Sequence, residues 1–193
     1  MNSHQLDNGR MSRLSFFLNC LSDPRIATFA ATPQKVVKKI CTRIDFSKDM
    51  IAVEYGPGDG AYTRHLLDSM TLNSRLIAIE TNKRFNVQLK RIDDSRLTVV
   101  NDDARNVLRI LRQNGVEQAS YVLSGIPFSM MHQESIQSII HDTSEALECG
   151  GKLLVYQFSS RVEKHLKRYF NNISVKLELG LPYYYVFEAS NSY

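Results

Sequence analysis

The most constraining feature of this chain is a short apolar segment that ends in an acidic residue and three alternating glycines. Residues 51–55 read Ile-Ala-Val-Glu-Tyr, and Gly56, Gly58 and Gly60 follow at every second position. Glycine has no Cβ, so the backbone can adopt positive φ there and lie directly against a ligand. A helix beginning near Ala61 would add the positive end of its dipole. The segment therefore predicts a strand whose carboxyl end presents a loop to a cofactor.

Strand-like and helix-like patterns alternate from this segment to the end of the chain. Apolar runs predict seven strands, at residues 51–55, 75–80, 97–101, 121–124, 152–158, 173–179 and 184–188. Helical spacing fills most of the intervals, and a further helix over residues 36–44 precedes the first strand. This alternation is typical of an α/β fold with helices on both faces of a mostly parallel sheet.

The last two predicted strands require a different connection. The link around Gly180, Leu181 and Pro182 is too short for a parallel crossover, so these strands should form an antiparallel hairpin. We therefore predict a seven-stranded, mostly parallel sheet with a C-terminal antiparallel hairpin in one domain, residues 46–193. Residues 1–45 are predicted to form N-terminal helices that cover the domain as an arm.

Composition and cysteine content indicate the class of protein and the cellular compartment. A chain of 193 residues with 43% hydrophobic residues suits one globular domain, and no segment is apolar enough to span a bilayer. Cys20, Cys41 and Cys149 stand singly, and no cleavable signal pattern precedes them. We expect a cytoplasmic protein without a cysteine metal site. The five histidines are equally scattered, so we expect no metal.

Basic residues concentrate in the N-terminal arm. From Arg10 to Ile44, seven Lys or Arg residues stand against one Asp, a net charge of +6, and the rest of the chain carries −2. Apolar residues recur there at helical spacing, at Met11, Leu14, Phe17, Leu18 and Leu21. A basic amphipathic helix of this kind can bind an anionic membrane surface. It can equally cover one edge of the sheet, and the sequence leaves both interpretations open.

The glycine loop alone does not select the cofactor. Residues 56–61 also satisfy the dinucleotide fingerprint G-x-G-x-x-G/A, and Glu80 ends the second strand where a ribose-binding acid is expected in either case. A nicotinamide enzyme or a cofactor-binding module without catalysis therefore remains an alternative. A dehydrogenase, however, needs additional residues for a substrate domain, whereas six alternating strands and a terminal hairpin use up this chain.

The order of elements and these residues resemble the class I S-adenosylmethionine-dependent methyltransferases from residue 51 to the end. The resemblance implies S-adenosyl-L-methionine as cofactor and S-adenosyl-L-homocysteine as product. It also implies which residues bind the cofactor. The glycine loop contributes Glu54, Tyr55, Gly56, Pro57, Gly58 and Gly60, the ribose is bound by Glu80 and Thr81, and the adenine by Asp102, Asp103 and Ala104. Ser124 is a further cofactor-binding residue. A carboxylate such as Glu80 can accept hydrogen bonds from both ribose hydroxyls. Asp103 is also well placed to cap the following helix.

The fourth strand ends in Ser124-Gly125-Ile126-Pro127-Phe128, which in this fold family faces the transferable methyl group. Ribosomal RNA adenine dimethyltransferases carry Asn or Asp, then Leu or Ile, Pro and an aromatic residue there. Gly125 cannot supply that side-chain acceptor. The Ser-Gly-Ile-Pro-Phe form instead resembles the bacterial phospholipid N-methyltransferases, as do Asp-Pro-Arg at residues 23–25 and Tyr-Gln-Phe at residues 156–158.

This second resemblance implies transfer of methyl groups to an amine nitrogen, with phosphatidylethanolamine or a similar phospholipid as acceptor. An enzyme acting on ribosomal RNA adenine or on a small amine is the alternative, and nucleic acid is the less favoured partner. The methylated product is a fixed cation, which aromatic faces at Phe128, Phe158, Tyr183, Tyr184 or Tyr185 could accommodate. Arg161 is the candidate for contacting a lipid phosphate. The enzyme would then be peripheral on the inner face of the membrane.

Overall fold

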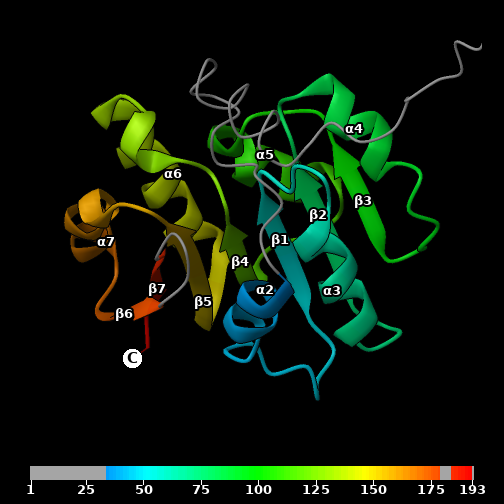
Figure 1. Cartoon of the computed structure of the whole chain (residues 1–193), viewed down its shortest axis with the longest axis horizontal. Helices are drawn as coiled ribbons and strands as arrows, with labels where there is room; N and C mark the ends of the chain where they lie inside the picture. Colours follow the sequence, from blue (N-terminus) through cyan, green and yellow to red (C-terminus); the bar gives the residue numbers. More distant parts are fainter. Residues whose placement is uncertain (1–33, 179–183, 193) are drawn as a thin grey trace, which may run out of the picture.

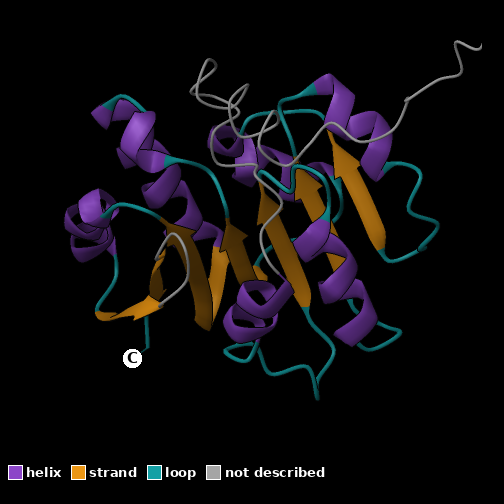
Figure 2. Cartoon of the chain, in the orientation of Figure 1, coloured by secondary structure: helices purple, strands orange, loops and turns teal. Residues whose placement is uncertain are grey.

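The computed structural model describes residues 34–178 and 184–192, and in them a seven-stranded sheet with helices on both faces (Figures 1 and 2). The strands follow one another as β1 Ile51–Tyr55, β2 Arg75–Ile79, β3 Leu97–Val100, β4 Ala119–Ser124, β5 Leu147–Gln157, β6 Asn172–Glu178 and β7 Tyr184–Ser190. Their order in the sheet is β3-β2-β1-β4-β5-β7-β6. Strand β7 is antiparallel to both β5 and β6, and every other pair is parallel. The predicted fold class is confirmed.

The helices fill the intervals between strands, as the periodicity predicted. They are α2 Gln34–Cys41, α3 Ala61–Ser69, α4 Lys83–Leu89, α5 Val107–Gln113, α6 Gln133–Ala146 and α7 Glu163–Tyr169. Single 3₁₀ turns follow three of the strands: η1 Ala104–Asn106, η2 Phe128–Met130 and η3 Ser160–Val162.

One boundary differs clearly from the sequence prediction. Strand β5 begins at Leu147 rather than at residue 152, because α6 ends at Ala146 and the chain passes straight into the strand. The segment contains Gly150, which has a φ of 77°. It also contains Gly151, where a Cβ would lie 2.9 Å from the carbonyl oxygen of Glu148. Glycines in a row read as a loop in the sequence, although here they let the strand pass close to its neighbour.

Two hydrophobic cores lie on opposite faces of the sheet. Residues of α2 and α3 pack on one face, where Val37, Ile40 and Leu66 are almost completely buried. Residues of α5, α6 and α7 pack on the other face, and Figure 1 shows these helices on the far side from α2 and α3. Successive strand residues alternate between the two cores, so Glu54 points toward α3 and Tyr55 toward α6.

Helix α2 is fixed by charge as well as by apolar packing. Arg43, just after this helix, pairs with Glu178 at 3.4 Å and with Glu188 at 3.6 Å, and Lys39 also pairs with Glu178. Glu188 pairs further with Lys152 at 2.8 Å. Two basic residues of the arm therefore bind the antiparallel end of the sheet.

The rest of the arm, with the amphipathic helix predicted from Met11 to Leu21, lies outside the described residues. Cys20 and Tyr183 lie outside them as well. Across residues 34–178 and 184–192, none of the helices combines the length and the apolar character needed to cross a bilayer.

Candidate active site

The sheet order reverses between β1 and β4, so the loops after these two strands leave in opposite directions. Ligands of open α/β sheets bind at such a point, beyond the carboxyl ends of the strands. The glycine loop follows β1, Glu80 directly follows β2, and residues 124–128 begin at the last residue of β4. The Gly125 N–H donates to the carbonyl oxygen of Tyr55 at 3.1 Å, which holds the β1 and β4 ends together. These strand ends point toward the top of Figure 1.

Hydrogen bonds give the glycine loop a defined shape. The Gly56 N–H donates to the carbonyl oxygen of Ile79, and the Gly60 N–H to that of Pro57, both at 2.9 Å. Gly58 has a φ of 56°, and its N–H donates to Glu80 Oε2 at 3.1 Å. A residue with a Cβ would be strained at this φ. The backbone of the loop after β1 therefore contacts Glu80, the acid that follows β2.

Glu80 is held rigidly and retains free acceptor capacity. Its side chain is 3% exposed, and Oε1 accepts a hydrogen bond from the Asn82 N–H at 2.7 Å. Burial raises the pKa of this carboxyl, while hydrogen bonds from the backbone of Asn82 and Gly58 oppose the rise. A carboxylate offers about four lone-pair sites, and these two N–H groups use two of them. The exposed Thr81 also interacts with this carboxylate through its backbone and its hydroxyl. A pair of ribose hydroxyls would take the remaining sites in place of Thr81.

Glu54 lies beside Glu80 in an apolar setting. It is 1% exposed, and Oε2 accepts a hydrogen bond from the Thr63 hydroxyl at 2.6 Å. Oε1 is buried and has no partner in the described part of the chain. Burial raises the pKa of Glu54 to about 8, and the negative charges of Glu80 and Asp59 add to the rise. A buried acceptor without a donor is costly, so Oε1 is a candidate to receive a hydrogen bond from a ligand.

Other predicted cofactor residues have partners within the protein. Asp103 Oδ1 accepts from the Arg105 N–H at 2.9 Å and caps η1, as the capping interpretation predicted. Asp102 accepts from Asn106 Nδ2 at 2.7 Å and from Arg109 at 2.5 Å. Ala104 is buried behind them. Adenine contact by this segment stays a prediction, and capping coexists with it.

Some side chains at the ends of β1 and β4 are buried in the hydrophobic core, and others lie at the candidate site. Tyr55 is fully buried, and its hydroxyl pairs with Thr143 on α6 at 3.0 Å, so near the glycine loop it offers its backbone. Phe128 is also fully buried in the α5 and α6 core, the ordinary packing of an aromatic residue. Ser124 Oγ is buried without a partner in the described ranges. Ile126 packs on the same core, Pro127 is partly exposed, and Thr81 is exposed.

The aromatic residues of the last strands divide between the two faces. Phe158 is 39% exposed, and its ring lies 4.5 Å from that of Tyr184. Tyr185 points to the opposite face, where its ring lies 6.2 Å from Phe187. Arg161 is exposed at the start of η3. The structure thus places Phe158 and Tyr184 together on the Glu54 face.

Two aromatic residues on that face were missed by the sequence reasoning. The rings of Tyr62 on α3 and Tyr156 on β5 lie 4.4 Å apart. Burial raises the pKa of both hydroxyls, and the negative charge of Glu54 adds to the rise. The feature of the sequence that could have pointed to Tyr156 is Gly125. A Cβ there would meet the Tyr156 hydroxyl at 2.2 Å, so the missing side chain makes room for this phenol.

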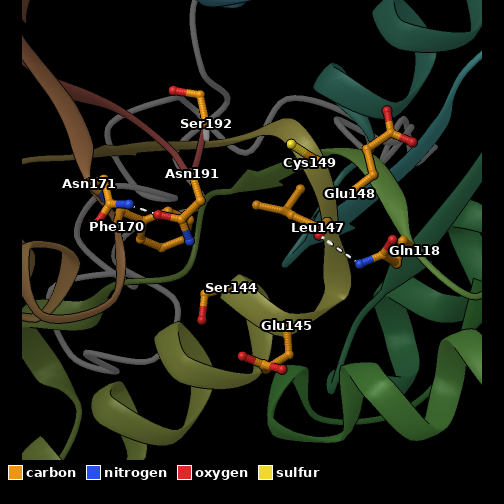
Figure 3. Close-up of a pocket in the computed structure, with 10 residues that line it drawn as sticks. All are labelled: Gln118, Ser144, Glu145, Leu147, Glu148, Cys149, Phe170, Asn171, Asn191 and Ser192. Carbon is orange, nitrogen blue, oxygen red and sulfur yellow. Dashed lines mark hydrogen bonds between the residues drawn. The ribbon is translucent and has the colours of Figure 1, made fainter.

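A separate hollow of about 430 Å³ lies at the opposite end of the sheet (Figure 3). Its lining comes from the start of β5, the end of α6 and the end of β7, and includes Gln118, Leu147 and Asn191. Leu147 pairs with Ala119, the first residue of β4, so the hollow is at the amino end of that strand. Sheets of this kind bind ligands at the carboxyl end, and the hollow is therefore not the candidate site.

Comparison with known proteins finds similarity to methyltransferases. The family model for ribosomal RNA adenine dimethylases matches residues 31–110. An ornithine lipid N-methyltransferase from Singulisphaera acidiphila is 24% identical over 156 residues, which cover 79% of this chain and 81% of that protein.

Solved methyltransferases share the fold at low sequence identity. A 1,6-didemethyltoxoflavin-N1-methyltransferase from Burkholderia thailandensis, with S-adenosylhomocysteine bound, gives a TM-score of 0.67 at 13% identity over 94% of this chain and 87% of that one. Fibrillarin from Aeropyrum pernix, with S-adenosyl-L-methionine bound, gives 0.60 at 15% identity over 76% and 69%. With the strand order, the glycine loop and Glu80, these findings indicate an S-adenosylmethionine-dependent methyltransferase with the class I fold.

Proposed function

We propose that this methyltransferase acts on the amine nitrogen of a lipid headgroup, that of phosphatidylethanolamine or a similar phospholipid. The observation that carries the proposal is Gly125 at the end of β4, with a tyrosine hydroxyl packed against its backbone. An enzyme that methylates a flat base amine uses a side-chain carbonyl at this point, and glycine has none. The similarity to an ornithine lipid N-methyltransferase supports an aliphatic lipid amine.

The match to adenine dimethylases favours a second candidate, methylation of RNA. That match covers residues 31–110 and ends before β4. It therefore spans the glycine loop, Glu80 and Asp103, which serve the cofactor, and leaves out residues 124–128, which face the acceptor. For this reason the lipid amine is the better supported acceptor.

The residues present fit the cofactor by their unused hydrogen-bonding capacity. Glu80 is proposed to accept from the ribose hydroxyls, and Glu54 Oε1 from a cationic part of the ligand. The Gly58 region lets the backbone approach, and Asp103 borders the adenine. S-adenosylmethionine supplies, when bound, a methyl group already activated by a positively charged sulfur.

The chain's main contribution to the reaction is placement. The amine nitrogen would take the methyl group that the cofactor supplies, with the electron pair of the broken bond left on the cofactor's sulfur, and the ammonium product would lose a proton before another transfer. Fixing the amine in line can account for about 7–11 kcal/mol of the barrier in favourable cases. Phe158 and Tyr184 offer faces to the growing cation, an attraction of roughly 0.5–2 kcal/mol per ring. Arg161 is proposed to meet the lipid phosphate.

A lipid acceptor requires the enzyme to reach a membrane surface. The amphipathic helix predicted from Met11 to Leu21 is the proposed contact, because basic residues near an anionic surface each contribute about 1 kcal/mol of attraction. Lys39 and Arg43 belong to the same basic segment but pair with Glu178 of the edge strand β6. The membrane contact is therefore proposed for the residues before α2 alone.

The proposal is tested by following a labelled methyl group. The full chain is incubated with labelled S-adenosylmethionine and, in separate reactions, phospholipid vesicles, ribosomal RNA and a mixture of small amines. We expect label in the lipid fraction, with a Glu80→Ala variant as the matched negative control. Label in RNA, with none in lipid, would instead establish the second candidate.

A further inference from the structure

The Tyr156 hydroxyl lies where a side chain of residue 125 would begin. A Cβ built on Gly125 would be 2.2 Å from Tyr156 Oη and 2.7 Å from the ring carbon that bears it. Gly125 directly follows β4, whose end is proposed to face the transferable methyl, and its N–H donates to the carbonyl oxygen of Tyr55 at the end of β1. The phenol therefore occupies the position from which other amine methyltransferases of this fold extend a side-chain acceptor.

Neighbouring groups keep this phenol neutral and available. The Tyr62 ring packs against it with centroids 4.4 Å apart, and the Tyr62 hydroxyl is buried without a partner in the described residues. Burial, followed by the negative charge of Glu54, raises the pKa of Tyr156 well above its ordinary value. No hydrogen bond joins the Tyr156 hydroxyl to another group within residues 34–178 and 184–192. A neutral hydroxyl without a partner retains its acceptor lone pairs.

We propose that Tyr156 contacts the acceptor amine in place of a side chain at position 125. Its oxygen accepts a hydrogen bond from an amine N–H and thereby turns the nitrogen lone pair toward the transferable methyl. Tyr62 holds the Tyr156 ring in place from the α3 side. This inference rests on the proposed function, because it takes an aliphatic amine as the acceptor.

The number of N–H groups on the acceptor makes the role measurable. A neutral primary amine has two N–H groups, a secondary amine has one, and a tertiary amine has none. A hydrogen bond to Tyr156 can therefore assist the first and second transfers and is absent in the third. A residue that merely supported the fold would affect all three transfers to the same degree.

The test compares the full chain with Tyr156→Phe on vesicles of phosphatidylethanolamine and of its N-methyl and N,N-dimethyl forms. We expect kcat to fall about 10-fold or more on the first two lipids and less than about 3-fold on the dimethyl form, with S-adenosylhomocysteine affinity unchanged. If the wild type accepts the primary amine alone, a 10-fold loss of kcat with unchanged affinity is the supporting result. Equal loss on all accepted lipids, or no loss, overturns the role of Tyr156.

A wild type that methylates none of these lipids would refute the proposed function itself, and this inference with it. The contact with Gly125 is tested separately by thermal unfolding of Gly125→Ala, Tyr156→Ala and the double variant. The methyl group added at position 125 should lower the melting temperature of the wild type and leave that of Tyr156→Ala nearly unchanged. Equal losses in both backgrounds would show that the phenol does not occupy this position.

Discussion

Glu80→Ala is expected to weaken S-adenosylhomocysteine binding by about 2–3 kcal/mol, roughly 30- to 150-fold, because it removes two charge-assisted hydrogen bonds to the ribose. The same carboxylate also accepts from the N–H groups of Gly58 and Asn82, so its loss loosens the glycine loop. Isothermal titration calorimetry measures the effect. Glu117→Ala removes an exposed acid at the other end of the sheet and is the matched control, with affinity expected to stay unchanged.

A ligand without the 2′-hydroxyl separates ribose contact from loop loosening. The wild type should bind the 2′-deoxy form of S-adenosylhomocysteine more weakly than S-adenosylhomocysteine itself. Glu80→Ala should bind the two ligands with almost the same affinity. Unchanged affinity of Glu80→Ala for S-adenosylhomocysteine would remove the ribose assignment. Tighter binding of NAD than of S-adenosylhomocysteine by the wild type would contradict the cofactor as well.

Cofactor affinity is expected to increase with pH because of Glu54. In the free protein, burial raises the pKa of this carboxyl to about 8, so it is mostly protonated at neutral pH. A cationic ligand favours the charged form and lowers the pKa, and binding therefore releases a proton. Affinity should rise by up to about tenfold per pH unit below 8 and level off above it.

Titration of S-adenosylhomocysteine into the wild type and into Glu54→Gln, followed by calorimetry from pH 6 to pH 9, tests this linkage. The ligand's own amino group titrates equally with both proteins, so the ratio of the two affinities isolates Glu54. We expect the wild-type advantage to grow as the pH rises toward 8. A ratio independent of pH would contradict the proposed contact between Glu54 and a cationic ligand.

The same raised pKa predicts how the ligand-free protein responds to pH. The ordinary pKa of about 4.5 becomes about 8 in the folded state, so the contribution of Glu54 to stability is complete below pH 4.5 and is lost as the pH rises through 8. The loss amounts to a few kcal/mol. Glu54→Gln should therefore unfold at a higher temperature than the wild type at pH 9.

The sequence predicted the sheet and the glycine loop well because both depend on local patterns. A short apolar run that is flanked by glycines or by helical patterns predicts a strand, as for β1, whatever packs against that strand. The reversed hairpin followed from a connection too short to cross the sheet. The start of β5 was misplaced because α6 continues directly into the strand, and no turn residue marks the boundary.

Contacts between distant parts of the chain were beyond the sequence patterns. Tyr62 and Tyr156 are far apart in sequence and meet only because the fold brings the start of α3 close to the end of β5. Phe128 resembled a residue that faces the acceptor, yet the turn after β4 directs its ring into the core. The alternation of side chains along β7 places Tyr184 and Tyr185 on opposite faces, so at most some of the candidate tyrosines can share one face.

A crystal structure of the chain with S-adenosylhomocysteine would locate the cofactor. We predict the ligand at the carboxyl ends of β1, β2 and β4, with its ribose hydroxyls on the Glu80 carboxylate and its backbone contacts at Gly58. Ligand bound in the hollow beside Leu147 instead, or a vacant crevice between β1 and β4 at saturating ligand, would contradict this prediction.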